Sequence, residues 1–122
     1  MNKGDKINSD ETLYRRGYNS PLKKFLNPDG SATSRVFKPR PKDNGKLSVD
    51  LANLTTMESS ITDENQYNLF ELLNSVVEEI GLETVYDPSL NNIAHSLIQS
   101  IDILDDISPA YLAKRAKKIF PL

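Results

Sequence analysis

Residues 34–52 of the chain read SRVFKPRPKDNGKLSVDLA, and the predicted sheet is built around them. In its second half, KLSVDL, apolar and polar residues alternate, and this period of two predicts a half-buried strand. Residues 34–38 are a second predicted strand, which ends at Pro39 because proline withdraws a backbone donor. The turn residues 43–45 lie between the two strands, so the sequence predicts a hairpin near residues 34–52.

The fold class predicted around this hairpin is α+β, with a small sheet and two helices. Residues 13–18 (LYRRGY) and 82–86 (LETVY) are typical of short strands. Residues 63–80 place apolar side chains at steps of three and four. This spacing predicts one central amphipathic helix, which ends at Gly81.

The two ends of the chain differ in how clearly their structure can be predicted. Residues 93–104 fit a helical stripe and a short buried strand equally well, so both alternatives stay open. Residues 109–120 are predicted to form a basic C-terminal helix with Ser108 as its N-cap. Residues 1–12 are polar and lack periodicity, which predicts a flexible arm before a single α+β domain over residues 13–122.

Length and composition exclude several classes of protein. The chain has 122 residues and no Cys, which excludes disulfides, zinc fingers, thiol catalysis and iron–sulfur ligation. Its N-terminus lacks the apolar run of a secretory signal, and its apolar stretches are far shorter than a transmembrane helix requires. We therefore expect a cytoplasmic protein that makes no membrane contact and needs no metal and no cofactor.

Charge is sharply segregated along the chain. Residues 1–50 hold 11 Lys and Arg and 6 Asp and Glu, whereas residues 51–110 hold 11 acidic residues and no Lys or Arg. Residues 111–122 add four cations and no acid. Because so many carboxylates in one segment repel one another, much of the basic segment is expected to pair with the acidic one. The expected acidic partners are Glu71, Glu78 and Glu79.

Nine side chains are candidates for contact with a protein partner or with phosphate groups. Most are cations that can follow a phosphate backbone, and one is an aromatic ring that can stack on a base. The nine candidates are Arg15, Arg16, Arg35, Phe37, Lys38, Arg40, Lys42, Ser48 and His95.

The sequence gives little indication of catalysis or metal binding. His95 is the only histidine, so it is either a hydrogen-bonded structural residue or a general base, and an imidazole metal site lacks a second ligand. The chain contains neither a Gly-x-Ser-x-Gly elbow nor a Gly-rich phosphate loop, so no catalytic residue is assigned. Asp102, Asp105 and Asp106 are expected to form a solvated helix-entry loop, with one carboxylate near the helix dipole.

Residues 32–55 resemble a group of short uncharacterised bacterial proteins that share a Ser-x-x-Phe-Lys-Pro stretch followed by Asp-x-Gly-x-Leu-Ser-Val. The pattern falls here on Ser34, Phe37, Lys38, Pro39, Asp43, Gly45, Leu47, Ser48 and Val49. A second match covers residues 92–98 (NIAHSLI), where Ile93 replaces the proline that is usual in the group. The resemblance implies a bacterial or phage origin, and a conflict or defence system with a protein partner, but no established activity.

Three hypotheses about function follow. The first is a non-enzymatic accessory or interaction subunit that binds a larger protein, because no catalytic constellation is evident and the Pro-rich first third can order on binding. The second is nucleic-acid binding through the basic N-terminal half. The third is a small nucleotide-handling enzyme, similar to an ADP-ribosyltransferase, that uses Arg15, Ser48 and His95.

Overall fold

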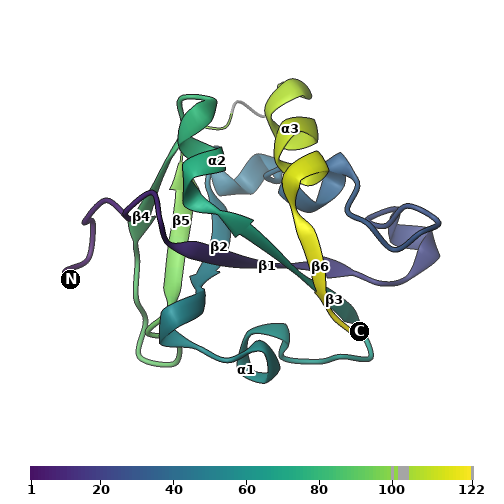
Figure 1. The fold of residues 1–122 in the computed structure, drawn as a ribbon, viewed down its shortest axis with the longest axis horizontal. Coiled ribbons are helices and arrows are strands. Elements are labelled where there is room, and N and C mark those ends of the chain that lie inside the picture. Colours follow the sequence, from purple (N-terminus) through teal and green to yellow (C-terminus); the bar gives the residue numbers. More distant parts are fainter. Residues whose placement is uncertain (100, 102–104, 122) are drawn as a thin grey trace.

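The computed structural model of the protein describes residues 1–99, 101 and 105–121 (Figure 1). The fold is α+β, as predicted, and within these residues six strands form one antiparallel sheet of order β4-β5-β2-β1-β3-β6. The strands are β1 (Thr12–Tyr18), β2 (Leu47–Leu51), β3 (Tyr67–Leu73), β4 (Glu83–Tyr86), β5 (His95–Gln99) and β6 (Lys117–Phe120). The helices are α1 (Met57–Ile61), α2 (Asn74–Glu79) and α3 (Ile107–Arg115). Short 3-10 turns are η1 (Pro21–Lys23), η2 (Ser34–Phe37), η3 (Pro41–Asp43) and η4 (Ala52–Leu54).

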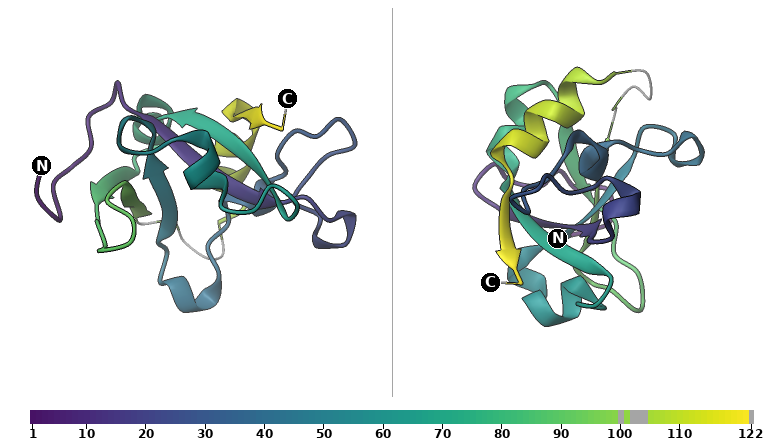
Figure 2. Two further views of the ribbon diagram at one scale, coloured as in Figure 1. Left: turned by 90° about the horizontal axis from the view of Figure 1, so that it is seen from below. Right: turned by 90° about the vertical axis from the view of Figure 1, so that its right-hand side faces the viewer.

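The sheet has two halves that are joined along a short seam. Strand β1 pairs with β3 along its whole length, but it pairs with β2 only where Leu13 lies opposite Leu51 and Tyr14 opposite Asp50. Beyond this seam the two strands part, and in Figure 1 β1 and β3 cross the direction of β2 and β5. The loop that follows β1 stands out from the body of the protein at this open end (Figure 2). The sheet is therefore open at the end of β1 that carries its arginines.

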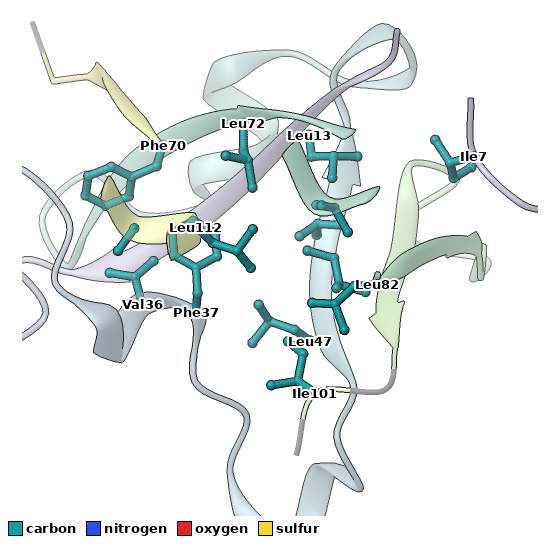
Figure 3. Packing of buried hydrophobic residues seen from close by; sticks show 14 of the residues in the cluster. Ile7, Leu13, Val36, Phe37, Leu47, Phe70, Leu72, Leu82, Ile101 and Leu112 are labelled. Atoms are coloured by element: carbon teal, nitrogen blue, oxygen red, sulfur yellow. The ribbon is translucent and has the colours of Figure 1, made fainter. Parts of the chain in front are cut away.

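The hydrophobic core lies between one face of the sheet and the segments α2, α3 and η2. Phe37 of η2, Phe70 of β3 and Leu112 of α3 are fully buried and lie close together (Figure 3). Helix α1 lies on the opposite side of the sheet from α2 and α3 (Figure 1). There the Ser60 hydroxyl donates to Asp50 over 2.7 Å. This face of the sheet therefore carries a polar contact between β2 and α1.

The predicted hairpin over residues 34–52 is wrong in its first half. Residues 47–51 form the predicted strand β2, but residues 34–37 form the 3-10 turn η2. Val36 and Phe37 are adjacent in the chain and are both fully buried. A strand directs neighbouring side chains to opposite faces, so only a turn can send both into the same core.

The predicted helix over residues 63–80 is also wrong over its first eleven residues, 63–73. Strand β3 occupies the first part and pairs with β1, and only the last part forms helix α2. The sheet buries Leu69 on one face and Phe70 and Leu72 on the other, so the apolar positions satisfy a strand as well as a helix. Gly81 does follow the helical end, with φ +77°.

The predicted C-terminal helix is shorter than expected and begins earlier. Helix α3 ends at Arg115, and the following residues form β6, which pairs with β3. The predicted N-cap Ser108 is wrong, because Ser108 lies inside α3 and Asp106 occupies the N-cap position. The expected carboxylate at the helix entry is that of Asp105, which accepts from the backbone N–H groups of Ile107 and Ser108 at 2.8 and 3.2 Å. Hydrogen bonds from the Ser108 side chain and then its backbone lower the pKa of Asp105.

The remaining predicted elements agree with the structure where it describes them. Strands β1 and β4 coincide with the two short predicted strands. The ambiguous stretch 93–104 contains strand β5, while its residues 100 and 102–104, including Asp102, lie outside the described residues. Among the described residues, no helix has the length and apolar character needed to cross a membrane.

Residues 1–12 make definite contacts with the sheet. The backbone N–H groups of Gly4 and Ile7 donate to the carbonyls of Tyr86 and Thr84, and the Ile7 side chain is buried. Asn74, which has no exposed surface, donates to the Ile7 and Asn8 carbonyls at 3.0 and 3.1 Å. Its side-chain oxygen accepts from the Thr84 hydroxyl over 2.6 Å. Flexibility of this segment in solution stays a prediction.

We expect the change Asn74→Ala to destabilise the protein and to loosen its N-terminal segment. The substitution leaves buried carbonyl and hydroxyl groups without a partner, at a cost of about 1–3 kcal/mol for such a group. Urea unfolding should show this loss, and hydrogen exchange at Gly4 and Ile7 should accelerate. The matched variant Asn53→Ala removes one exposed bond to Glu11 and should change neither quantity appreciably. Equal effects of the two substitutions would contradict the proposed role of Asn74.

Candidate functional site

A basic cleft of about 420 Å³ opens where β1 and β2 part. This volume lies within the range of about 300–1,000 Å³ that is typical of small-molecule sites. Among the residues described, one carboxylate, that of Asp43, lines the cleft together with six cations. The cations are Arg15, Arg16, Arg35, Lys38, Arg40 and Lys46. We refer to this site as the basic cleft.

Arg15 fills the gap between the two halves of the sheet. Its Nε donates to the carbonyl of Val36 over 2.9 Å, and its guanidinium NH1 donates to the carbonyl of Ser48 over 2.8 Å. Burial, followed by the nearby charge of Arg16, lowers the pKa of Arg15 to about 10. The side chain is therefore still a cation at neutral pH, and two backbone groups fix its position.

Two of the other cations lie near carboxylates. Lys38 forms an ion pair with Asp106, and Arg40 lies 3.2 Å from Asp43. Burial acts to raise the pKa of Asp43, but hydrogen bonds from the Arg40 backbone and guanidinium outweigh it and lower the pKa. Asp43 is therefore ionised at neutral pH and offsets part of the Arg40 charge.

The expected pairing of the 35–46 cations with the acidic middle segment has a different form from the one predicted. Within the described residues, the ion pairs of these cations are with Asp43 and Asp106, and not with the three expected glutamates. Farther away, Lys6 lies 3.5 Å from Glu78. Most of the basic cleft thus remains open to an anion from outside.

Aromatic rings form one wall of the basic cleft. Tyr18 and Tyr67 have ring centroids 5.0 Å apart, and Phe25 meets Tyr18 edge-on at 5.4 Å. The guanidinium of Arg16 lies 5.1 Å from the centre of the Tyr67 ring. A hydrogen bond with Tyr18, together with burial, raises the pKa of Tyr67, so this phenol stays neutral and adds no negative charge to the site.

A smaller cavity of about 140 Å³ adjoins the basic cleft and shares Arg15, Arg16 and Ser48 with it. His95 lines this cavity, and its Nε2 lies 3.1 Å from the Ser48 hydroxyl. Its Nδ1 lies 2.8 Å from the backbone carbonyl of Asp87 and 3.2 Å from the carboxylate of the same residue. These contacts join β2, β5 and the loop after β4.

The structure brings together most of the nine predicted residues. Phe37 is buried in the core, so the prediction that it stacks on a base is wrong. Lys42 is exposed on η3 and does not line the cleft. His95 lies in the adjoining cavity. The cleft itself is lined by Arg15, Arg16, Arg35, Lys38, Arg40 and Ser48.

Sequence reasoning missed the residues that complete the site. The pattern of residues 13–18 already places Tyr18 on the same strand face as Arg16, which is a signal for the aromatic wall. Tyr67 lies near the start of the predicted helix 63–80, and a helix there does not pair Tyr67 with Tyr18. Asp87 directly follows the predicted strand 82–86, and nothing local in the sequence connects it to His95.

Comparison of the chain with protein-family models, with curated proteins and with solved structures gives no match. Across residues 1–99, 101 and 105–121, no three His, Cys, Asp or Glu side chains lie close enough together to hold a metal ion. The chemistry of the site is therefore argued from its own side chains.

We expect Arg15→Ala to lower the free energy of unfolding by about 2 kcal/mol, because it leaves the carbonyls of Val36 and Ser48 without their charged donor. Denaturant unfolding measures this change. The control Arg35→Ala removes a cation from the same cleft but only a long, exposed bond to Lys23, and should change stability by less than about 0.5 kcal/mol. If Arg15→Ala is as mild as the control, Arg15 does not hold the sheet together.

Proposed function

We propose that the protein binds the phosphate groups of a nucleotide, either free or within a single-stranded nucleic acid, in the basic cleft. The observation that carries this proposal is the meeting of six cations and a single described carboxylate around one cleft. Both kinds of ligand present the same chemistry to the protein, namely a phosphate ester next to a base. The basic N-terminal half of the sequence supports the same function.

The guanidinium groups are suited to a phosphate ligand. Arginine presents a planar set of donors that matches two phosphate oxygens at once. Arg15 is already held by Val36 and Ser48, so it loses little conformational freedom when an anion arrives. The partial desolvation that lowers its pKa also strengthens its attraction for an anion in the cleft.

The aromatic wall provides a surface for a base. Tyr18 is 38% exposed, and Phe25 and Tyr67 hold its ring from two sides. Bases stack on such rings with little sequence preference, at about 1–3 kcal/mol per base. Phosphate groups against the arginines and a base against Tyr18 then occupy the same cleft.

The two other hypotheses have different support. Arg15, Ser48 and His95, which the enzyme hypothesis named, lie together at the junction of the two cavities, and this favours a nucleotide ligand. The likeness to an ADP-ribosyltransferase stays a prediction. The accessory-subunit hypothesis and its association with defence systems also stay predictions.

Fluorescence anisotropy with labelled ADP and with a labelled single-stranded oligonucleotide tests the proposed function. Arg16→Ala and Arg35→Ala should each weaken binding at least about 10-fold, since a charged hydrogen bond contributes about 1.5–3 kcal/mol. The control Lys114→Ala removes the same charge from an exposed position outside the cleft, and should leave the affinity within about twofold.

Salt dependence distinguishes the two sources of phosphate. If the ligand is a nucleic acid, affinity for the oligonucleotide exceeds that for ADP and falls steeply with salt, because several phosphates release counterions. If the ligand is a free nucleotide, ADP binds at least as tightly. The absence of binding to both at low salt, or an equal loss in Lys114→Ala, contradicts the proposal.

A further inference from the structure

We propose that Ser48, His95 and Asp87 form a nucleophile–base relay that hydrolyses phosphate esters of nucleotides held in the basic cleft. This inference rests on the proposed function, because the cleft must first bring a phosphate ester to Ser48. It adds a reaction to that function and assigns a role to three residues that binding alone does not need.

Hydrogen-bond geometry selects the tautomer of the neutral histidine ring. The two nearest partners of His95 Nδ1 are the carbonyl and the carboxylate of Asp87, and both can only accept. In neutral His95 the proton must therefore lie on Nδ1. Nε2 is left as an acceptor, and the Ser48 hydroxyl donates to it over 3.1 Å. This is the arrangement that a general base needs.

Neighbouring polar groups leave this arrangement undisturbed. Asp50 lies opposite His95 in the β2–β5 ladder, but its two carboxylate oxygens accept from Ser60 and Asn92 at 2.7 and 2.8 Å. On the far side, Lys3 lies 3.7 Å from the Asp87 carboxylate. The partner of His95 on the cleft side is Ser48.

Ser48 lies between the basic cleft, which is the proposed phosphate site, and His95. Its exposed side chain lines both cavities, and both cavities are also lined by Arg15 and Arg16. The Ser48 carbonyl accepts from Arg15, so the guanidinium is held next to the nucleophile. When a phosphorus atom is attacked, negative charge collects on its equatorial oxygens, and fixed cations stabilise that charge.

The reaction proceeds in two balanced steps. In the first, Ser48 Oγ forms a bond to phosphorus while the ester P–O bond breaks, and the serine proton passes through His95 Nε2 to the leaving oxygen. In the second, water attacks the phosphoserine, His95 takes a proton from the water, and the Oγ–P bond breaks. Ser48 Oγ recovers its proton from His95. Water is the only co-reactant.

A fluorophosphonate probe tests the nucleophile directly, because its P–F bond breaks as Oγ–P forms. Intact mass and peptide mapping of the full chain should show one phosphonyl adduct on Ser48. Ser48→Ala should abolish this adduct, and His95→Ala and His95→Gln should slow its formation at least about 100-fold, the usual contribution of a general base. The control Ser59→Ala removes another exposed serine and should label normally.

Turnover is measured as nitrophenolate release from the p-nitrophenyl ester of thymidine 5′-monophosphate, and it should follow the same order of variants. Asp87 is a positioning residue, so Asp87→Ala should reduce the limiting rate of labelling severalfold while the half-saturating probe concentration stays unchanged. The inference is overturned by an adduct that persists in Ser48→Ala, by labelling that is indifferent to both His95 substitutions, or by the absence of labelling and turnover.

These experiments distinguish a failure of the proposed nucleotide binding from a failure of the proposed reaction. If ADP binds wild type and Ser48→Ala equally but Ser48 is neither labelled nor active, the proposed function stands and the relay is refuted. If Ser48 is labelled through His95 but neither ADP nor the oligonucleotide binds, the basic cleft is not a nucleotide site. In that case this inference falls together with the proposed function on which it rests.

Discussion

The architecture depends on one side chain, that of Arg15, which lies where β1 and β2 cannot pair around it. Arg15 lies between Leu13 and Gly17 on the buried face of β1, so a continuous β1–β2 ladder would drive its charge into the core. Instead the strands part after Tyr14, and the guanidinium occupies the gap. It donates there to the Ser48 carbonyl, which β1 no longer reaches, and to the carbonyl of Val36. The cleft is the space left by this arrangement.

The strands that sequence reasoning found are those whose pattern does not depend on a partner. Residues 47–51 alternate so regularly that any sheet would use them in the same way. The prediction for residues 67–73 was wrong for the opposite reason. Leu69 is buried on one face of β3 and Phe70 and Leu72 on the other, and these apolar residues also fit a helical stripe. Pairing with β1 decides between the two, and it is a contact distant in sequence. The turn at Val36 and Phe37 likewise exists because the core needs both side chains.

The candidate site, like the fold, could be predicted from the sequence only in part. Its cations could be predicted because charge is visible in the composition of residues 1–50. Their meeting in one cleft could not be predicted, because it requires β1 and β2 to part after a two-residue seam. The contact of His95 with Ser48 joins positions 47 residues apart, and the role of Asp87 follows only from the pairing of β4 with β5. Local motifs do not indicate contacts between positions that are so far apart in the sequence.

Ser48 connects the fold to the chemistry. Its carbonyl accepts from Arg15 and its hydroxyl lies within hydrogen-bonding distance of His95, so one residue joins the group that separates the strands to the group that can take a proton. Its place on β2 fixes both contacts, because Ser48 is held opposite Leu97 in the ladder and cannot move independently of β5. In the proposed reaction, a phosphate held by the cations lies beside a serine whose place the sheet has already set. The charge segregation of the sequence thus has a local meaning, because cations of residues 1–50 gather in the gap beyond the seam, where β1 and β2 part.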